Sequence, residues 1–281
     1  MATAFATSGF ATTAFAPFRS AEPTALLPDL YQRAPYDLAI VSSPEPDGMH
    51  FRLGFASAVE NVGSGPLLIV GHRSSTGEAA MRADQIVRLR GGGTRSVPDV
   101  GVLRYAVSET HEHWHLERLD RYELRPVGAV SALLEDRKTG FCLGDRYRVP
   151  WAPSVALLPR KTLCGPGEPE LLRVVEGLSP GYGDVYPANI EGQYLDVTRV
   201  PAGDYVLINR VNEDRALVET QYRNDVAWVL VSLSWPDGQR SQPSLTILDS
   251  CEPGRSGQRA RCPFPAAART ASRGLLKVER R

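Results

Sequence analysis

Three of the five histidines in this chain lie within five residues, in the run His111-Glu112-His113-Trp114-His115. Side chains along a β-strand alternate between its two faces, so residues 111, 113 and 115 of a strand project from the same face. Imidazole nitrogens suit Cu(II) or Zn(II) better than Mg²⁺ or Ca²⁺, which prefer oxygen ligands. The spacing therefore predicts a metal site on a strand, and the residue types alone do not distinguish copper from zinc.

The residues around the histidines support an extended chain. Trp114, Leu116, Tyr122 and Leu124 have the opposite parity to the three histidines. In a strand that runs from residue 111 to residue 124, these four side chains would all face a core. The elements that position the histidines are therefore predicted to be strands.

The rest of the chain follows the same pattern. Strands are predicted where Val, Leu, Ile, Tyr and Phe recur, at residues 51–59, 67–70, 101–107, 111–124, 194–200, 204–211, 227–235 and 244–248. The turn sequence at 61–66 predicts a hairpin between the first two. Helical periodicity is nearly absent, and Gly and Pro are frequent. We predict an all-β fold, a β-sandwich of mostly antiparallel strands, Ig-like in general architecture, with long loops at 73–99 and 143–179.

Composition argues against two classes of partner. The 32 basic and 32 acidic residues give a net charge of zero, whereas a protein that binds nucleic acid needs a basic surface. No apolar stretch is long enough to cross a bilayer as a helix, so no integral membrane segment is predicted.

The N-terminus and the cysteines indicate export. Residues 1–16 end in the small-residue pattern of a secretory cleavage site but lack its basic leading region, and a disordered tail is the alternative. The local spacing of Cys142, Cys164, Cys251 and Cys262 suits two disulfides, although four cysteines allow three pairings. Four unpaired thiols in a cytosolic protein are the alternative. We expect a secreted or extracytoplasmic protein whose signal sequence is incomplete in this chain.

Six segments in order along the chain resemble the lysyl oxidase family, particularly its compact bacterial members. They are LPDL from residue 27, HFRLGFASAVENVGSGPL from 50, HEHWH from 111, KTGFCL from 138, GYGDVYPANIEGQYLDVTRVPAGDYVL from 181 and EDRALVETQYRND from 213. Each segment alone is a weak or moderate signal. Together, in this order, they form a specific resemblance over residues 27–233.

The resemblance implies a copper(II) site at His111, His113 and His115, and a cofactor made from the protein's own side chains. That cofactor is lysine tyrosylquinone, to which Lys138 and Tyr186 would contribute. Copper would let O₂ oxidise the Tyr186 ring to an ortho-quinone, and the neutral Lys138 amine, whose effective concentration is very high, would add to it. The implied activity is oxidative deamination of primary amines, either peptidyl lysine or small amines. The products are an aldehyde, ammonia and hydrogen peroxide.

The catalytic base is a separate question. Asp184 precedes Tyr186 by two residues and would share its face in a strand, so it is a candidate for the base that removes the substrate α-proton. The alternative for Asp184 is a turn residue after Gly183. Lys138 and Tyr186 have structural alternatives as well, as an exposed charge and a core-edge tyrosine. If water were added to the oxidised ring in place of Lys138, a topaquinone-like cofactor would result.

Two other functions would share the histidine site. In a non-catalytic exported copper- or zinc-binding β-sandwich, Lys138 and Tyr186 would have no joint role. In a zinc hydrolase, a base would lie beside metal-bound water and Tyr186 would be irrelevant. The sequence favours the amine oxidase.

Three regions are predicted along the chain. Residues 1–26 form the clipped signal-like or disordered segment, and residues 27–235 form a lysyl-oxidase-like catalytic β-sandwich. Residues 236–281 form a C-terminal extension with one strand and a disulfide loop.

Overall fold

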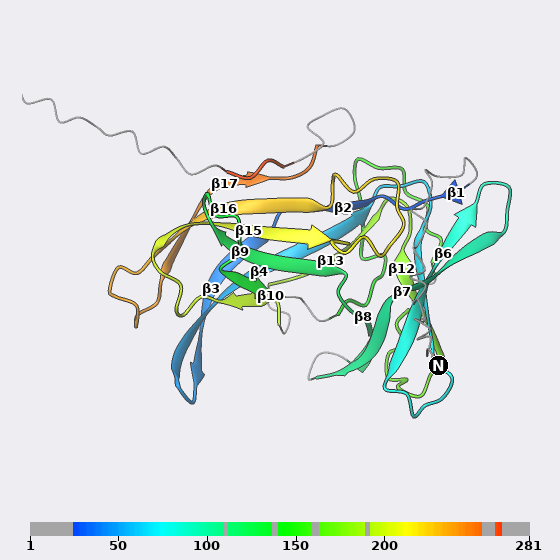
Figure 1. Ribbon diagram of the computed structural model, residues 1–281, viewed down its shortest axis with the longest axis horizontal. Helices are drawn as coiled ribbons and strands as arrows, with labels where there is room; N and C mark the ends of the chain where they lie inside the picture. Colours follow the sequence, from blue (N-terminus) through cyan, green and yellow to red (C-terminus); the bar gives the residue numbers. More distant parts are fainter. Residues whose placement is uncertain are drawn as a thin grey trace, which may run out of the picture.

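All regular structure in the described part of the chain is β-strand (Figure 1). The computed structural model describes residues 25–108, 112–136, 140–158, 163–188, 192–254 and 262–265. Every strand pair within these ranges is antiparallel, and the strands form three sheets. The predicted all-β class is confirmed. The same ranges contain no helix long and apolar enough to cross a membrane.

The first sheet carries the histidine strand at one edge. Its order is β12 (Arg173–Leu178), β5 (Leu67–His72), β6 (Ala80–Leu89), β7 (Thr94–Val107) and β8 (Glu112–Leu116), and β1 (Ala25–Leu26) also pairs with β6. The prediction of a loop at 73–99 is wrong, because β6 and the start of β7 lie there. Met81, Ala83 and Val87 alternate on the buried face of β6, while charged residues between them face outward, as in a half-exposed antiparallel sheet.

The second sheet contains the most regular strands of the sequence. Its order is β10 (Leu134–Asp136), β9 (Asp120–Pro126), β15 (Gly203–Val211), β16 (Val226–Ser234) and β17 (Ser244–Cys251). The strands predicted at 204–211, 227–235 and 244–248 are confirmed as β15, β16 and β17. Since β17 pairs with β16, part of the predicted C-terminal extension completes this sheet.

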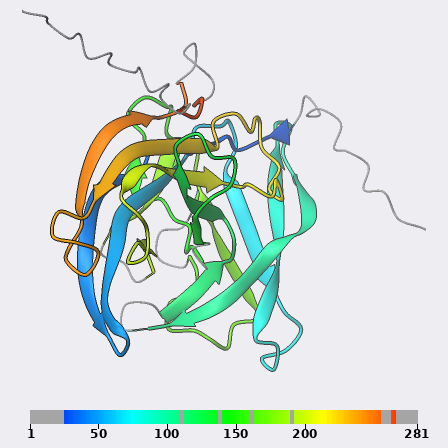
Figure 2. The ribbon, with the colours of Figure 1, turned by 60° about the vertical axis from the view of Figure 1, so that its left-hand side comes forward.

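The third sheet is built around one long strand, β4 (Gly48–Asn61). It pairs with β2 (Leu30–Gln32), β3 (Tyr36–Glu45), β13 (Tyr182–Tyr186) and β14 (Tyr194–Asp196), and β11 (Tyr147–Arg148) pairs with β13. The strand predicted at 194–200 is therefore shorter than expected. In Figures 1 and 2 the β3–β4 hairpin and the β6–β7 hairpin lie on opposite sides of the molecule.

The hairpin predicted around residues 61–66 is wrong, because β4 and β5 belong to different sheets. The turn residues carry the chain across from one sheet to the next. A Cβ on Gly63 would lie 2.4 Å from the Asp29 nitrogen, and one on Gly65 would lie 1.9 Å from the Leu26 oxygen. The turn signal was real, but its glycines allow close contact with residues 26–29 and do not close a hairpin.

The predicted strand at 111–124 is divided in two. β8 ends at Leu116, a turn follows in which Arg118 has a φ of 65°, and β9 begins at Asp120 in the second sheet. Residues of one parity stay buried on both sides of the turn. The parity argument therefore identified the core residues, although the histidines and Tyr122 are on different sheets.

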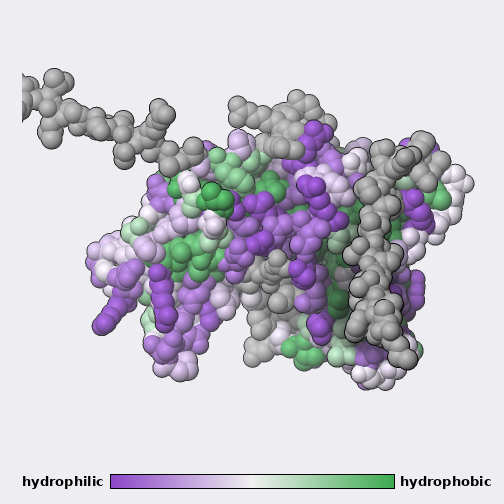
Figure 3. All heavy atoms as spheres, viewed as in Figure 1, coloured by the Kyte–Doolittle hydropathy of each residue, from purple (hydrophilic) through white to green (hydrophobic). Residues whose placement is uncertain are grey.

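One hydrophobic core joins the three sheets. Phe55 of β4 and Tyr122 of β9 meet edge to face with ring centroids 4.9 Å apart, so the second and third sheets pack face to face, as a sandwich requires. On the face shown in Figure 3, polar residues cover most of the surface and apolar residues form separate patches. Strands with one buried and one solvent-facing side produce such a surface.

Candidate functional site

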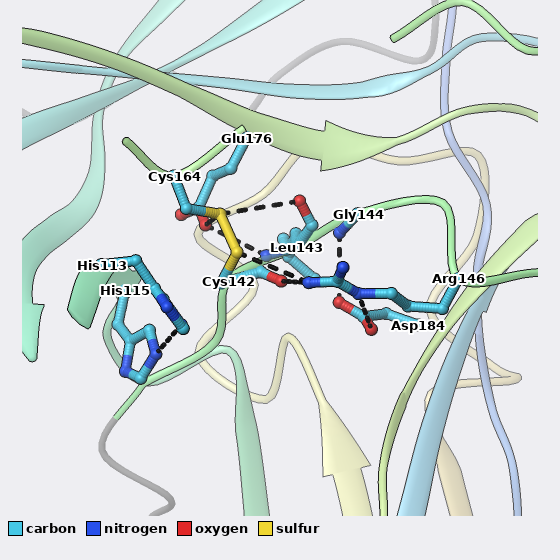
Figure 4. The surroundings of a disulfide bond; sticks show 9 residues. All are labelled: His113, His115, Cys142, Leu143, Gly144, Arg146, Cys164, Glu176 and Asp184. Atoms are coloured by element: carbon cyan, nitrogen blue, oxygen red, sulfur yellow. Dashed lines mark hydrogen bonds and ion pairs between the residues drawn. A yellow bond between two sulfur atoms is a disulfide. The ribbon is translucent and has the colours of Figure 1, made fainter. Parts of the chain in front are cut away.

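The histidine strand presents two imidazoles away from the core. Trp114 and Leu116 of β8 are buried in the core, so the alternation of the strand places His113 and His115 on its other face. The Nε2 atoms of these two rings lie 2.8 Å apart, and the ring centroids are 4.6 Å apart. The two side chains converge, as the sequence predicted (Figure 4).

This geometry suits two ligands of one metal ion. Nitrogens bound to the same ion at roughly 2.0–2.1 Å are roughly 2.9–3.4 Å apart for bond angles between square and tetrahedral. The observed 2.8 Å between the Nε2 atoms of His113 and His115 is close to the lower end of that range. His111 lies outside the described residues. No group of three or more metal-binding side chains occurs among the residues that the structure describes, so the third ligand stays a prediction.

Tyr186 lies at the end of β13, beside Ser57 of β4. Its side chain is only 7% exposed, and its ring packs edge to face against Phe141 with centroids 4.3 Å apart. Burial raises the pKa of the phenol well above its ordinary value, and the charges of Asp184 and Glu176 act in the same direction. The phenol is therefore protonated at neutral pH and is shielded from bulk water.

Asp184 lies within β13 and is 2% exposed, so its interpretation as a turn residue is wrong. One carboxylate oxygen accepts a hydrogen bond from the Gly144 N–H at 3.1 Å, and the other lies 3.4 Å from Arg146 Nε. Burial raises the pKa of Asp184 to about 7, although the positive charge of Arg146 lowers it. A carboxyl group with this pKa exchanges a proton readily near neutral pH.

The segment 140–144 joins the histidine strand to the tyrosine. Phe141 and Leu116 exchange two backbone hydrogen bonds of 2.8 and 3.0 Å, while the Phe141 side chain contacts the Tyr186 ring. A Cβ on Gly140 would lie 2.4 Å from the His115 Cβ. Glycine is therefore required where this segment passes His115.

Lys138, the predicted partner of Tyr186, lies outside the described residues. Gly140, two residues later, lies against His115. The joint role of Lys138 and Tyr186 stays a prediction.

Sequence reasoning missed Glu176 and Arg146. Glu176 is a wholly buried acid on β12, and burial raises its pKa well above the ordinary value. Arg146 is 52% exposed and forms an ion pair with Asp184. No local sequence pattern identifies either residue, because each is brought to the site by the pairing of strands that are distant in the sequence.

The cysteines pair locally. Disulfides join Cys142 to Cys164 and Cys251 to Cys262, and the alternative of four unpaired thiols is wrong. Arg146 Nη2 lies 3.6 Å from the Cys142 sulfur. In the view of Figure 4, the Cys142–Cys164 disulfide lies between the histidine pair and Asp184.

A cavity of about 380 Å³ opens beside the disulfide. It is lined by His113, Cys142, Gly144, Asp145, Arg146, Leu163 and Pro166. The cavity thus connects one candidate metal ligand with the segment that contacts Tyr186. It is large enough for an unbranched side chain.

Two of the family-like segments, LPDL and ETQYRND, meet in space although about two thirds of the chain separates them. The Leu30 N–H donates to the Glu219 carboxylate at 2.7 Å, and the Asn224 amide donates to Asp29 at 2.8 Å. Burial raises the pKa values of Asp29, Glu219 and Asp225. This buried polar cluster ties the N-terminal strands to the turn before β16.

Comparison with known proteins gives a consistent result. The chain is 30% identical to protein-lysine 6-oxidase of Homo sapiens over 120 residues, which are 41% of this chain and 25% of the human protein. The same identity and length relate it to the protein of Sus scrofa, of which 42% is covered. It is 28% identical to lysyl oxidase homolog 1 of Homo sapiens over 120 residues, 18% of that protein. The chain thus matches less than half the length of each of these relatives.

The family model described as lysyl oxidase matches residues 81–235, which are more than half of the 281 residues. The matched region contains the histidine strand, the 140–144 segment, Asp184 and Tyr186. This chain belongs to the lysyl oxidase family.

Proposed function

We propose that this protein is a copper-dependent amine oxidase whose cofactor, lysine tyrosylquinone, forms from Lys138 and Tyr186. The observation that carries the proposal is the 140–144 segment, whose residue Gly140 passes His115 and whose residue Phe141 contacts Tyr186. A metal-binding strand and a buried phenol are thereby connected by one short piece of chain.

The histidines would hold copper, with His113 and His115 supported by their geometry and His111 by the sequence. The bound quinone would supply the electron sink for amine oxidation, and copper would supply the contact with O₂. The reaction consumes a primary amine, O₂ and water. It releases an aldehyde, ammonia and hydrogen peroxide, so that the two electrons leaving the amine reduce O₂.

The protein's own residues would manage protons and water. Asp184 shares a strand face with Tyr186 and is proposed as the base for the substrate α-proton, because a pKa of about 7 suits proton transfer near neutral pH. Arg146 beside Asp184 stabilises the ionised carboxylate. The packing of Phe141 on Tyr186 would limit the access of water to the ring.

The cavity beside His113 would admit the substrate amine. Its volume of about 380 Å³ accommodates an unbranched chain, such as a lysine side chain or a small alkylamine, and both remain candidates. Two disulfides favour an oxidising, extracytoplasmic location.

Phenylhydrazine labelling tests the proposal. Copper-loaded protein matured in O₂ is treated anaerobically, scanned for a visible absorbance band and digested for peptide mass mapping. We expect a band and a cross-linked peptide that contains Lys138 and Tyr186. Tyr186→Phe should abolish both, while Tyr182→Phe, a buried phenol at the other end of β13, should retain both.

Other results would redirect the proposal. A phenylhydrazine label on a Tyr186 peptide that lacks Lys138 would support the amine oxidase, but its cofactor would then be a topaquinone-like group and not lysine tyrosylquinone. One tightly bound copper without any band would favour the metal-binding module. Purification with zinc, and hydrolase activity unaffected by Tyr186→Phe, would favour the hydrolase.

A further inference from the structure

Glu176 is a buried acid that the proposed chemistry does not use. It lies in β12 with 0% of its surface exposed. Its Oε2 accepts a hydrogen bond from the Leu143 N–H at 3.1 Å and lies 3.4 Å from the Cys164 sulfur (Figure 4). Its Oε1 has no hydrogen-bond partner among the described residues.

Global stability does not account for this side chain. Burying a carboxyl group costs free energy, and one oxygen without a partner increases that cost. An apolar residue of similar volume, packed in the same place, would often leave the fold equally stable or more stable. The benefit of Glu176 must therefore be sought in the backbone that its carboxyl group holds, at Leu143 and at Leu116.

The hydrogen bond from Leu143 holds the segment that joins the two parts of the site. The next amide along the chain, that of Gly144, donates to Asp184 at 3.1 Å. Two buried carboxyl groups, one on β12 and one on β13, thus accept from consecutive amides, Leu143 and Gly144. The Cys142–Cys164 disulfide is a third attachment of the same segment.

We propose that Glu176 is a positioning residue, which holds the 140–144 segment so that Phe141 and Cys142 are placed against Tyr186. Where it concerns the cofactor, this inference rests on the proposed function. Lys138 precedes Gly140 by two residues, so the placement of the segment limits where the lysine amine can reach.

The cofactor-forming step is sensitive to such placement. A bond forms between the Lys138 nitrogen and a ring carbon of Tyr186, and the ring also gains one oxygen atom. Four hydrogens leave in total, and two molecules of O₂ accept the electrons, yielding one water and one hydrogen peroxide. Misplacement of reacting groups by about 1 Å slows such reactions by up to roughly a hundredfold.

Two variants of similar size separate positioning from general packing. Glu176→Gln keeps an acceptor oxygen for the Leu143 N–H, and Glu176→Met keeps the length of the side chain but replaces the carboxyl by a weak acceptor. Hydrogen exchange is measured on the metal-free protein with both disulfides intact. The cross-linking rate is measured by peptide mass after copper and O₂ are added, with copper content determined in parallel.

We expect amide hydrogen exchange in the peptide covering 140–146 to be about tenfold faster in Glu176→Met than in the wild type. A factor of about ten corresponds to the loss of one hydrogen bond. Peptides from β15 and β16 should exchange as in the wild type. In Glu176→Met, cross-linking should slow by between about tenfold and a hundredfold at unchanged copper content. Glu176→Gln should exchange and cross-link like the wild type.

The inference is overturned if Glu176→Met exchanges and cross-links like the wild type, or if exchange accelerates throughout the protein. It is also overturned if Glu176→Gln behaves like Glu176→Met. A wild-type protein that never cross-links, yet shows the local exchange pattern, would refute the proposed function while leaving the holding role of Glu176 intact.

Discussion

Asp184→Asn should make this protein more resistant to alkaline pH and remove the proposed amine oxidase activity. The pKa of Asp184 is raised from 3.8 to about 7 because the group is buried. A carboxyl group whose folded-state pKa is raised contributes stability that is fully present below the unfolded pKa. That contribution is lost as the pH rises towards 7.

The magnitude follows from the difference between the two pKa values. Each pKa unit corresponds to about 1.4 kcal/mol, so ionising Asp184 costs the folded state about 4 kcal/mol in total. Roughly 2–3 kcal/mol of this cost appears between pH 5 and pH 8. The remainder appears below pH 5, because the carboxyl group of the unfolded chain is already mostly ionised at that pH. Asparagine has a similar shape and does not titrate, so the variant lacks this loss.

Urea unfolding from pH 5 to pH 8, with the disulfides intact, measures the effect. The free energy of unfolding of Asp184→Asn, minus that of the wild type, should rise by roughly 2–3 kcal/mol across this range. Asp237→Asn, in an exposed turn, is the control and should change little. Other buried acids with raised pKa values give the same pH dependence in both proteins. Their contribution to the free energy of unfolding is therefore removed when the wild-type value is subtracted.

Peroxide formation from a primary amine is the second measurement on this variant. Because asparagine cannot accept the proton, the rate should fall by at least about a hundredfold. Parallel stability curves for the two proteins would show that Asp184 does not titrate in this range, and the account of a buried base would be wrong. Full activity in Asp184→Asn would assign the base to another residue.

Two further predictions concern the proposed metal site and the C-terminal disulfide. Gly140→Ala would place a Cβ 2.4 Å from the His115 Cβ, so unfolding free energy should fall by about 1–3 kcal/mol and copper affinity should weaken, as titration would show. Gly91→Ala, where a Cβ meets nothing within 4 Å, is the control, and equal effects of the two would contradict the steric argument. Replacing Cys251 and Cys262 by serine opens a loop with a sequence separation of 11 and should cost about 3 kcal/mol in urea unfolding. An unchanged midpoint would show that this disulfide adds nothing to stability.

The sequence by itself determined the local features of the protein. The alternation in HEHWH placed Trp114 in the core and turned His113 and His115 to the other face, because side-chain direction in a strand depends only on position along the chain. The strands β15, β16 and β17 were predicted for the same reason. The order of the motifs identified the family, and local cysteine spacing favoured two disulfides.

Only the tertiary structure decided which strands pair and which charges are buried. The predicted hairpin at 61–66 failed because strand pairing depends on segments that are distant in the sequence, such as β12 beside β5. Asp184 and Glu176 look like ordinary acids in the sequence. Their raised pKa values arise because other strands remove them from water. The chemistry expected of the site thus depends on burial, and burial is a property of the assembled sheets.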